Sequence, residues 1–386
     1  MRHPIVSGFF ACVAMAASLL AQAPHPRIVF IGDSITEGTI TRPTFRQPLW
    51  ERLNGAGYCF DFVGGRRGVI GGRTPTRPTY DLDHYGFSGE SSFEMCFQLL
   101  APIPQFDADI AVIQLGTNDV IKGTVFYSLS AQQIADLADQ FLRSMIGILQ
   151  NPPYNANMQI VIAQVPPLPA VLVPSPALNL PPSGPIYGLD QGILAVNAAI
   201  AGLASLPGVR VVDLHTGIDS QLHLADQVHP NAAGEQIIAD RVFQVLTQVL
   251  PPPTPSGACF SEFGKGAGTS EPTLTAAWRT SAPVLGSSFS LQIRDMIPYA
   301  PIVGVLGLES AAVPLANIDE FLFVNPLRYS EAWLIGTASA TGGMTWSLAV
   351  PMLPHLAGVE VYVQALAFAN DAVGAVTSGG ILRLGN

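Results

Sequence analysis

Basic residues are scarce in this sequence: 18 Lys and Arg stand against 28 Asp and Glu, which gives a formal net charge of -10. Proteins that bind nucleic acids or other anionic polymers need stripes of Lys and Arg that release counterions from the polymer. The sequence contains no such stripe. We therefore exclude nucleic acid as the main partner and expect a neutral substrate.

Long apolar runs are missing beyond the N-terminus, where no segment reaches the roughly 18 uninterrupted apolar residues of a membrane span. The one long run, 4–20, follows Arg2 and His3 and ends in Ala21-Gln22-Ala23. These are the charged, apolar and small-residue parts of a secretory signal peptide. An N-terminal membrane anchor is disfavoured because Ser and Gly interrupt the run. We expect a secreted protein whose mature chain begins near Pro24 and keeps no membrane attachment after cleavage.

Few cysteines remain once residues 1–23 are set aside. Cys59, Cys96 and Cys259 are an odd number of thiols in a compartment where disulfides form. The spacing is compatible with a Cys59–Cys96 bridge and equally with three separate buried thiols.

Apolar residues, by contrast, are plentiful: they make up 48% of the 386 residues, enough to bury a sizeable core, and the length favours two domains. Between Arg27 and about Leu250, strand-like runs alternate with helical patterns, which predicts an α/β fold with a parallel sheet covered by helices. Continuous apolar runs are typical of strands buried on both faces. Such runs occupy 28–31, 110–115, 159–163 and 209–213, and helical patterns include 132–149 and 232–250.

Prolines then interrupt the pattern at 251–257, an extended stretch typical of an interdomain linker. Beyond it, runs such as 289–293 and 359–364 alternate apolar with polar residues and predict a small antiparallel β-sandwich. We therefore divide the chain into a signal peptide (1–23), an α/β domain (24–250), a Pro-rich linker (251–258) and a C-terminal β-rich domain (259–386).

A candidate nucleophile follows the first expected strand directly, in Gly32-Asp33-Ser34. Open α/β sheets bind ligands at the carboxyl ends of their strands, and a glycine there permits a sharp turn. The hydroxyl of Ser34 is a weak nucleophile until a base takes its proton. A plain turn or a helix cap is the alternative role for this serine.

A base and a carboxylate occur together in Asp226-Gln227-Val228-His229, just before the last expected helix. In such a loop the carboxylate orients the imidazole and stabilises the imidazolium that forms. A merely structural hydrogen bond is the alternative, and Asp226 with His223 or Asp213 with His215 are competing pairs.

Acyl transfer also needs hydrogen-bond donors for the oxyanion. Asn118 follows the second expected strand and brings an amide donor to the same sheet edge as Ser34. Gly89 offers an unobstructed backbone N–H, and the N–H of Ser34 is a third donor. Each such donor stabilises the transition state by about 3 kcal/mol. An Asn turn and a flexible Gly-Ser loop are the alternatives.

Four blocks in this order resemble the SGNH (GDSL-type) hydrolases: Gly-Asp-Ser, a Gly-rich block with Gly89, Gly-Thr-Asn-Asp, and Asp-x-x-His-Pro. The resemblance covers Arg27 to about Leu250. It implies a three-layer αβα flavodoxin-like sandwich and no metal or other cofactor. No His/Cys/Asp cluster of the sequence has metal-ligand spacing either.

The same resemblance assigns roles to individual residues. It makes Ser34 the nucleophile, Gly89 and Asn118 oxyanion donors beside the Ser34 N–H, and Asp226 and His229 the remaining members of a Ser-His-Asp triad.

Within this group, residues 45–50, 60–64 and 81–89 resemble carbohydrate esterase family 3, whose members are secreted acetylxylan esterases. The resemblance implies hydrolysis of O-acetyl esters on a plant polysaccharide through an acyl-enzyme. The sequence departs from that family in having Tyr85 where a Glu is usual and in lacking an aromatic residue shortly after Gly89.

Two other functions compete with this one. The first is a lipase-like or aryl-ester hydrolase. The Pro-rich segment 165–190 follows the third expected strand on the catalytic side of the sheet, and its apolar residues would line the acyl pocket of such an enzyme. The alternative is that these residues simply pack over the edge of the sheet. These residues are Leu168, Val171, Leu172, Val173, Leu178, Leu180 and Ile186.

The other competitor is a surface-binding or adhesion protein in which the hydrolase domain is a scaffold and the C-terminal domain contacts polysaccharide or a cell surface. Three of the four tryptophans lie in that domain, where core positions are more common for them than sugar-stacking positions: Trp278, Trp333 and Trp346.

Overall fold

The computed structural model describes residues 25–386 except 43, 71–79, 101–105, 175–183, 254–256, 269–270, 277–281, 316–317, 319, 326–332 and 371. The expected signal peptide, Trp278, Leu178 and Leu180 lie outside the described residues, and so does the side chain of Trp333. Within the described part, no helix has the length and apolarity that a membrane crossing requires.

The α/β region is built on one sheet, which has seven strands among the described residues. Its pairs are parallel except for the antiparallel pair of β3 with β4. The strand order is β3 (Arg66–Arg67), β4 (Asp83–Gly86), β1 (Arg27–Gly32), β5 (Ile110–Gln114), β6 (Gln159–Ala163) and β9 (Val209–Val212), with β2 (Asp61–Val63) also pairing with β1. The four predicted strands are confirmed as β1, β5, β6 and β9. The added strands β2, β3 and β4 are too short to show a period in the sequence.

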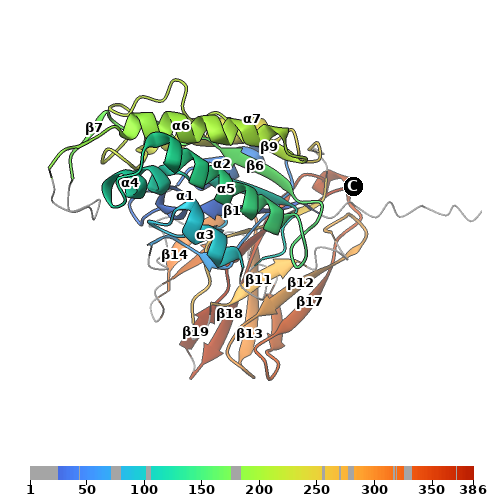
Figure 1. The fold of residues 1–386 in the computed structure, drawn as a ribbon. Helices are drawn as coiled ribbons and strands as arrows, with labels where there is room; N and C mark the ends of the chain where they lie inside the picture. Colours follow the sequence, from blue (N-terminus) through green and yellow to red (C-terminus); the bar gives the residue numbers. More distant parts are fainter. Residues whose placement is uncertain are drawn as a thin grey trace, which may run out of the picture.

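Helices cover both faces of this sheet, as the continuous apolar strands predicted (Figure 1). Val29 and Ile31 pack on one face with α3 (Ser92–Leu99), α5 (Ala131–Leu149) and α6 (Leu189–Gly202). Ile28 and Phe30 pack on the other face with α2 (Arg46–Gly55) and α7 (Ala232–Leu246). Successive residues of a strand point to opposite faces, so this alternation confirms the three-layer αβα fold.

Two short helices begin at the carboxyl edge of the sheet: α1 (Ser34–Glu37) directly after β1, and α4 (Thr117–Val125) directly after β5. Strands β1 and β5 are neighbours, with Gly32 paired to Gln114. The sheet therefore delivers Ser34 and Asn118 to the same edge.

The C-terminal region consists of antiparallel sheets, which lie below the α/β region in Figure 1. A six-stranded sheet has the order β10 (Cys259–Phe263), β20 (Gly379–Arg383), β18 (Glu360–Ala369), β13 (Pro301–Gly307) and β16 (Trp333–Thr337), with β19 (Ala372–Val376) also pairing with β18. A three-stranded sheet contains β11 (Thr273–Ala276), β12 (Ser288–Arg294) and β17 (Met344–Ala349), and β14 (Ser310–Pro314) pairs with β15 (Phe321–Val324). Phe289 and Trp346 are buried between the two larger sheets with Val363. The region is thus strand-rich in the manner of a β-sandwich.

A disulfide joins the two regions, and it differs from both alternatives considered for the cysteines. Cys59, just before β2, is bonded to Cys259 at the start of β10, at a sequence separation of 200 residues. Cys96 is a buried free thiol that packs between α3 and the sheet. Both the Cys59–Cys96 bridge and the three separate thiols were therefore wrong, because the docking of β10 beside β2 is a tertiary contact that spacing does not encode.

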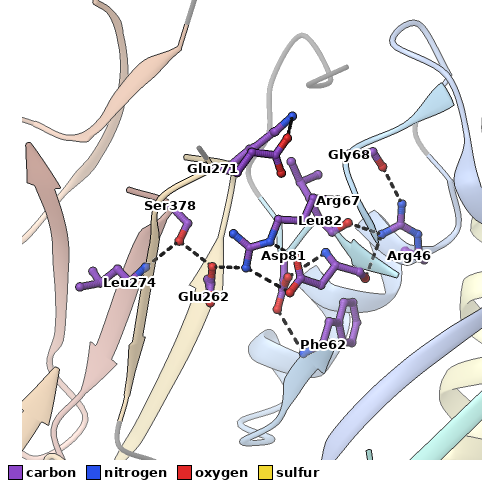
Figure 2. Close-up of polar contacts among 12 residues, drawn as sticks. Arg46, Phe62, Arg67, Gly68, Asp81, Leu82, Glu262, Glu271, Leu274 and Ser378 are labelled. Atoms are coloured by element: carbon purple, nitrogen blue, oxygen red, sulfur yellow. Dashed lines mark hydrogen bonds and ion pairs between the residues drawn. The ribbon is translucent and has the colours of Figure 1, made fainter. Parts of the chain in front are cut away.

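Charged groups are buried along the same interface (Figure 2). The Nε atom of Arg67 lies 2.5 Å from Asp83 Oδ1, and its Nη2 atom lies 2.8 Å from Oε1 of Glu262 in β10. Glu262 also accepts a hydrogen bond from the hydroxyl of Ser378. Burial raises the pKa of Asp83 to about 6 and raises the pKa of the neighbouring Asp81 well above its usual value. Phe263 and Phe323 complete the interface by entering the core beneath α2 and α7. The C-terminal region is docked on the α/β region through a shared core.

Candidate active site

Ser34 occupies the first position of α1, two residues after Gly32 ends β1. A Cβ atom on Gly32 would lie 2.1 Å from Thr36 Oγ1 and 2.6 Å from the carbonyl oxygen of Gln114, so only glycine fits there. Asp33 caps the helix by accepting a hydrogen bond from the N–H of Ile35 at 2.9 Å. The hydroxyl of Ser34 is thereby presented at the carboxyl edge of the sheet.

His229 and Asp226 reach this hydroxyl from the loop before α7. The Nε2 atom of His229 lies 2.8 Å from Ser34 Oγ, and its Nδ1 atom lies 2.9 Å from Asp226 Oδ2. A carboxylate can only accept, so Nδ1 carries the proton and Nε2 is free to accept the proton of Ser34. The structure brings together the three residues that the sequence predicted for proton transfer.

The carboxylate of Asp226 is held ionised. Burial opposes ionisation, but hydrogen bonds from the ring and from the backbone N–H of His229 outweigh it and hold the pKa of Asp226 well below its usual range. Arg42 adds a cation 3.5 Å from Asp226 Oδ2. Sequence reasoning missed Arg42, because no local pattern links it to a loop so far along the chain.

The competing Asp/His pairs do not form in the same way. The carboxylate of Asp213 accepts hydrogen bonds from the backbone N–H groups of His215 and Thr216 and so shapes a turn. The ring of His223 accepts a hydrogen bond from the N–H of Asp219 at 2.8 Å.

The expected oxyanion donors come from segments that are hydrogen-bonded to residues 33 and 37, on either side of Ser34 in the chain. Gly89 has φ +81°, and a Cβ atom built on it would meet open space. Neither its N–H nor that of Ser34 donates to an acceptor in the described part of the chain. The amide of Asn118 donates to Asp33 Oδ2 at 3.2 Å and to the carbonyl of Glu90 at 3.1 Å. One of these two bonds has to yield before Asn118 can donate to a substrate.

Glu37 is a further residue that shapes the site, and it is almost fully buried. Its carboxylate accepts a hydrogen bond from the N–H of Ser88 at 2.7 Å and pairs with Arg66 at 2.5 Å. It thereby ties the loop that carries Gly89 to the helix that carries Ser34. Its place in the Gly-Asp-Ser-Ile-Thr-Glu-Gly block was the available signal.

A second network ties α3 to α4. Asp119 accepts hydrogen bonds from the N–H of Ser92 at 3.0 Å and from its hydroxyl at 2.5 Å, and Lys122 pairs with Glu94 at 2.5 Å. Because α3 follows Gly89 and α4 contains Asn118, this network fixes the distance between two of the proposed donors.

Burial also shifts the pKa of Asp33, the residue next to Ser34. The side chain is fully buried, and this burial together with the nearby charge of Asp119 raises its pKa to about 7 in spite of the hydrogen bond from Ile35.

Among the described residues, no group of three or more His, Cys, Asp or Glu side chains is arranged to hold a metal ion.

Comparisons with known proteins identify a family. The GDSL-like lipase/acylhydrolase family matches residues 30–237. A multidomain esterase from Ruminococcus flavefaciens is 28% identical over 244 residues, and the match covers 56% of this chain but only 29% of that protein.

Two solved structures are also similar. A carbohydrate esterase family 3 protein from Talaromyces cellulolyticus is 25% identical with a TM-score of 0.42, and the match covers 58% of this chain and 97% of that one. A Clostridium thermocellum family 3 carbohydrate esterase is 19% identical with a TM-score of 0.42, covering 59% of this chain and 100% of that one.

Proposed function

The chain belongs to the GDSL-like lipase/acylhydrolase family and is a carboxylic ester hydrolase, and from this premise we propose that it is a secreted serine esterase removing acyl groups through an acyl-enzyme on Ser34. The observation that carries the proposal is the unbroken hydrogen-bond chain from Ser34 through His229 to Asp226. The proposed substrate is a neutral O-acetyl ester on a polysaccharide such as acetylxylan.

The residues divide the reaction between them. His229 takes the hydroxyl proton as Ser34 Oγ attacks the ester carbonyl, and Asp226 stabilises the imidazolium. The N–H groups of Ser34 and Gly89 and the amide of Asn118 bind the oxyanion of the tetrahedral intermediate, at about 3 kcal/mol for each donor. His229 then protonates the leaving alcohol. Water attacks the acyl-enzyme in the second half, with the same histidine as base.

A short acyl group is supported by the packing of the Pro-rich segment. Three of the apolar residues that would wall a long acyl pocket, Leu168, Leu172 and Ile186, are buried in the core beside α6. These three are therefore unavailable to line a channel for a fatty chain, whereas Val171 and Val173 of the same set are exposed. The net charge of -10 also favours a neutral polymer over an anionic one.

A fluorophosphonate probe tests the nucleophile. We expect covalent labelling at Ser34 in the wild type, and loss of both labelling and p-nitrophenyl acetate hydrolysis in Ser34→Ala. Activity retained by Ser34→Ala would refute the assignment.

Substrate preference is tested separately. We expect kcat/KM to fall from acetate to butyrate to octanoate esters and acetate to be released from acetylated xylan. A rise with chain length would favour the lipase-like alternative.

A further inference from the structure

Gln227 has an unusual backbone conformation at the centre of the proposed site. It lies between Asp226 and His229 and has φ +74°, in the left-handed region that L side chains other than those of Asn and Asp rarely adopt. Such conformations persist only where surrounding contacts enforce them, and they concentrate at functional sites. Contacts of Gln227 with its surroundings must therefore enforce this backbone conformation.

The holding contact is made by the side chain of Gln227 itself. Its Oε1 atom accepts a hydrogen bond from the N–H of Val173 at 3.0 Å, and its Nε2 atom donates to the carbonyl of Val173 at 3.2 Å. The two bonds use both ends of one planar amide, so they fix its orientation as well as its distance.

Val173 is a firm point of attachment because it directly follows strand β7, which is anchored in the core. Strand β7 (Val171–Leu172) pairs antiparallel with β8 (Ile186–Tyr187), and Leu172 and Ile186 are buried in the main core. Val171, Val173 and Tyr187 are exposed. Figure 1 shows β7 near the ends of α4 and α6, within the α/β region.

The ends of the turn 226–229 are held independently. The N–H of Ala225 donates to the carbonyl of His229 at 2.8 Å, and Leu224 forms an isolated antiparallel β-bridge with Pro230. The N–H groups of Val228 and His229 both point at Asp226 Oδ1, at 3.3 and 2.8 Å. A rotation of φ at Gln227 to the ordinary helical value would turn these two N–H groups away from the carboxylate that orients the imidazole.

We propose that Gln227 is a positioning residue for the proton-transfer pair. Its amide fastens the turn 226–229 to the β7–β8 strand pair, and this contact keeps the left-handed backbone that aligns Asp226 with His229. The β7–β8 strand pair thus supports the position of His229, the proposed general base. This inference rests on the proposed esterase mechanism.

The experiment compares Gln227→Met and Gln227→Gly with the control Val173→Ala. Methionine keeps the side-chain length but removes both hydrogen bonds, and glycine removes the side chain while accepting the left-handed backbone without strain. Val173→Ala leaves the main-chain partners in place. Each variant is assayed for kcat and KM on p-nitrophenyl acetate, for the rate of fluorophosphonate labelling at Ser34, and for its thermal midpoint.

We expect kcat and the labelling rate of both Gln227 variants to fall together by about ten- to a hundredfold, the effect of a small misplacement of a catalytic group, with KM nearly unchanged. Val173→Ala should stay within about twofold of the wild type, because its hydrogen bonds are intact. If only the thermal midpoint of Gln227→Gly falls, while its kcat and labelling rate stay at the wild-type values, the hydrogen bonds of Gln227 contribute to stability alone. That result would overturn the inference.

The same measurements separate this inference from the proposed function. If the wild-type Ser34 is not labelled, the esterase mechanism fails and the role of Gln227 fails with it. If Ser34 is labelled and both Gln227 variants react at the wild-type rate, only the role of Gln227 is wrong.

Discussion

The Nε2 atom of His229 lies 2.8 Å from the Oγ atom of Ser34, although 195 residues separate them in the chain. Two rigid elements set this distance, since Ser34 lies two residues after the end of β1 and His229 lies two residues before Asn231, the N-terminal cap of α7. The helix packs against β9 and β6 of the same sheet. The contact is therefore fixed by the sheet, and it can be tested by single substitutions.

Asp226→Asn should reduce kcat by roughly 10³- to 10⁴-fold with little effect on folding, because an amide in place of the carboxylate favours the wrong tautomer of the imidazole. Steady-state kinetics on p-nitrophenyl acetate measure the loss. Asp213→Asn is the matched control, since that carboxylate shapes a turn beside His215. Equal losses in the two variants would contradict the assignment of Asp226.

Glu37→Ala should lower kcat by about tenfold, because the loop that carries Gly89 loses its tie to α1 and a proposed oxyanion donor drifts. Glu37→Gln should lose less, because its amide oxygen still accepts the N–H of Ser88. Glu51→Ala, on the exposed side of α2, is the control and should behave as the wild type. A Glu37→Ala enzyme with full kcat would show that the loop is positioned by other contacts.

The contribution of Asp33 and Asp83 to stability should fall as pH rises from about 4 to about 7. Burial raises the pKa of Asp83 to about 6 and that of Asp33 to about 7, above the value near 3.8 of the unfolded chain. A carboxyl whose folded-state pKa is raised contributes stability that is complete below the unfolded value and is lost as pH passes the folded value. Urea unfolding at pH 5 and pH 8, of the wild type and of a variant that lacks one of these carboxyls, measures this contribution.

Asp33→Asn is the variant that isolates one of these groups. It should flatten the dependence on pH between 5 and 8, because the amide does not titrate. A dependence on pH that is the same in Asp33→Asn as in the wild type would contradict the raised pKa of Asp33.

Cys59→Ser should destabilise the protein by about 3–5 kcal/mol, since the disulfide to Cys259 closes a very long loop in the unfolded chain. Thermal unfolding with and without reductant measures this, and reductant should have no further effect on the variant. Cys96→Ala, which leaves the disulfide intact, should keep the sensitivity to reductant. Peptide mapping that linked Cys59 to Cys96 would refute the pairing.

Arg67→Met should cost about 3–5 kcal/mol of unfolding free energy, because it leaves Asp83 and Glu262 without their cation in a buried interface (Figure 2). Arg143→Met removes an exposed pair with Asp139 within one helix and should cost only about 0.3–0.5 kcal/mol. Similar losses in denaturant titrations of the two variants would show that the interface is hydrated.

The sequence by itself determined the fold class and the residues to examine. Continuous apolar strands such as 110–115 require cover on both faces, and short motifs at strand ends fall at one edge of a parallel sheet wherever the helices lie. These are local properties, so Ser34, Asn118 and His229 could be named as candidates before their positions in space were known.

Tertiary structure alone decided the partners. The disulfide of Cys59 with Cys259, the ion pair of Arg67 with Glu262, and the contacts of Asp226 with Arg42 and of Gln227 with Val173 join segments that no periodicity relates. The free energy of each contact depends on burial and distance after the elements have packed. A pattern of residue types along the chain carries neither quantity.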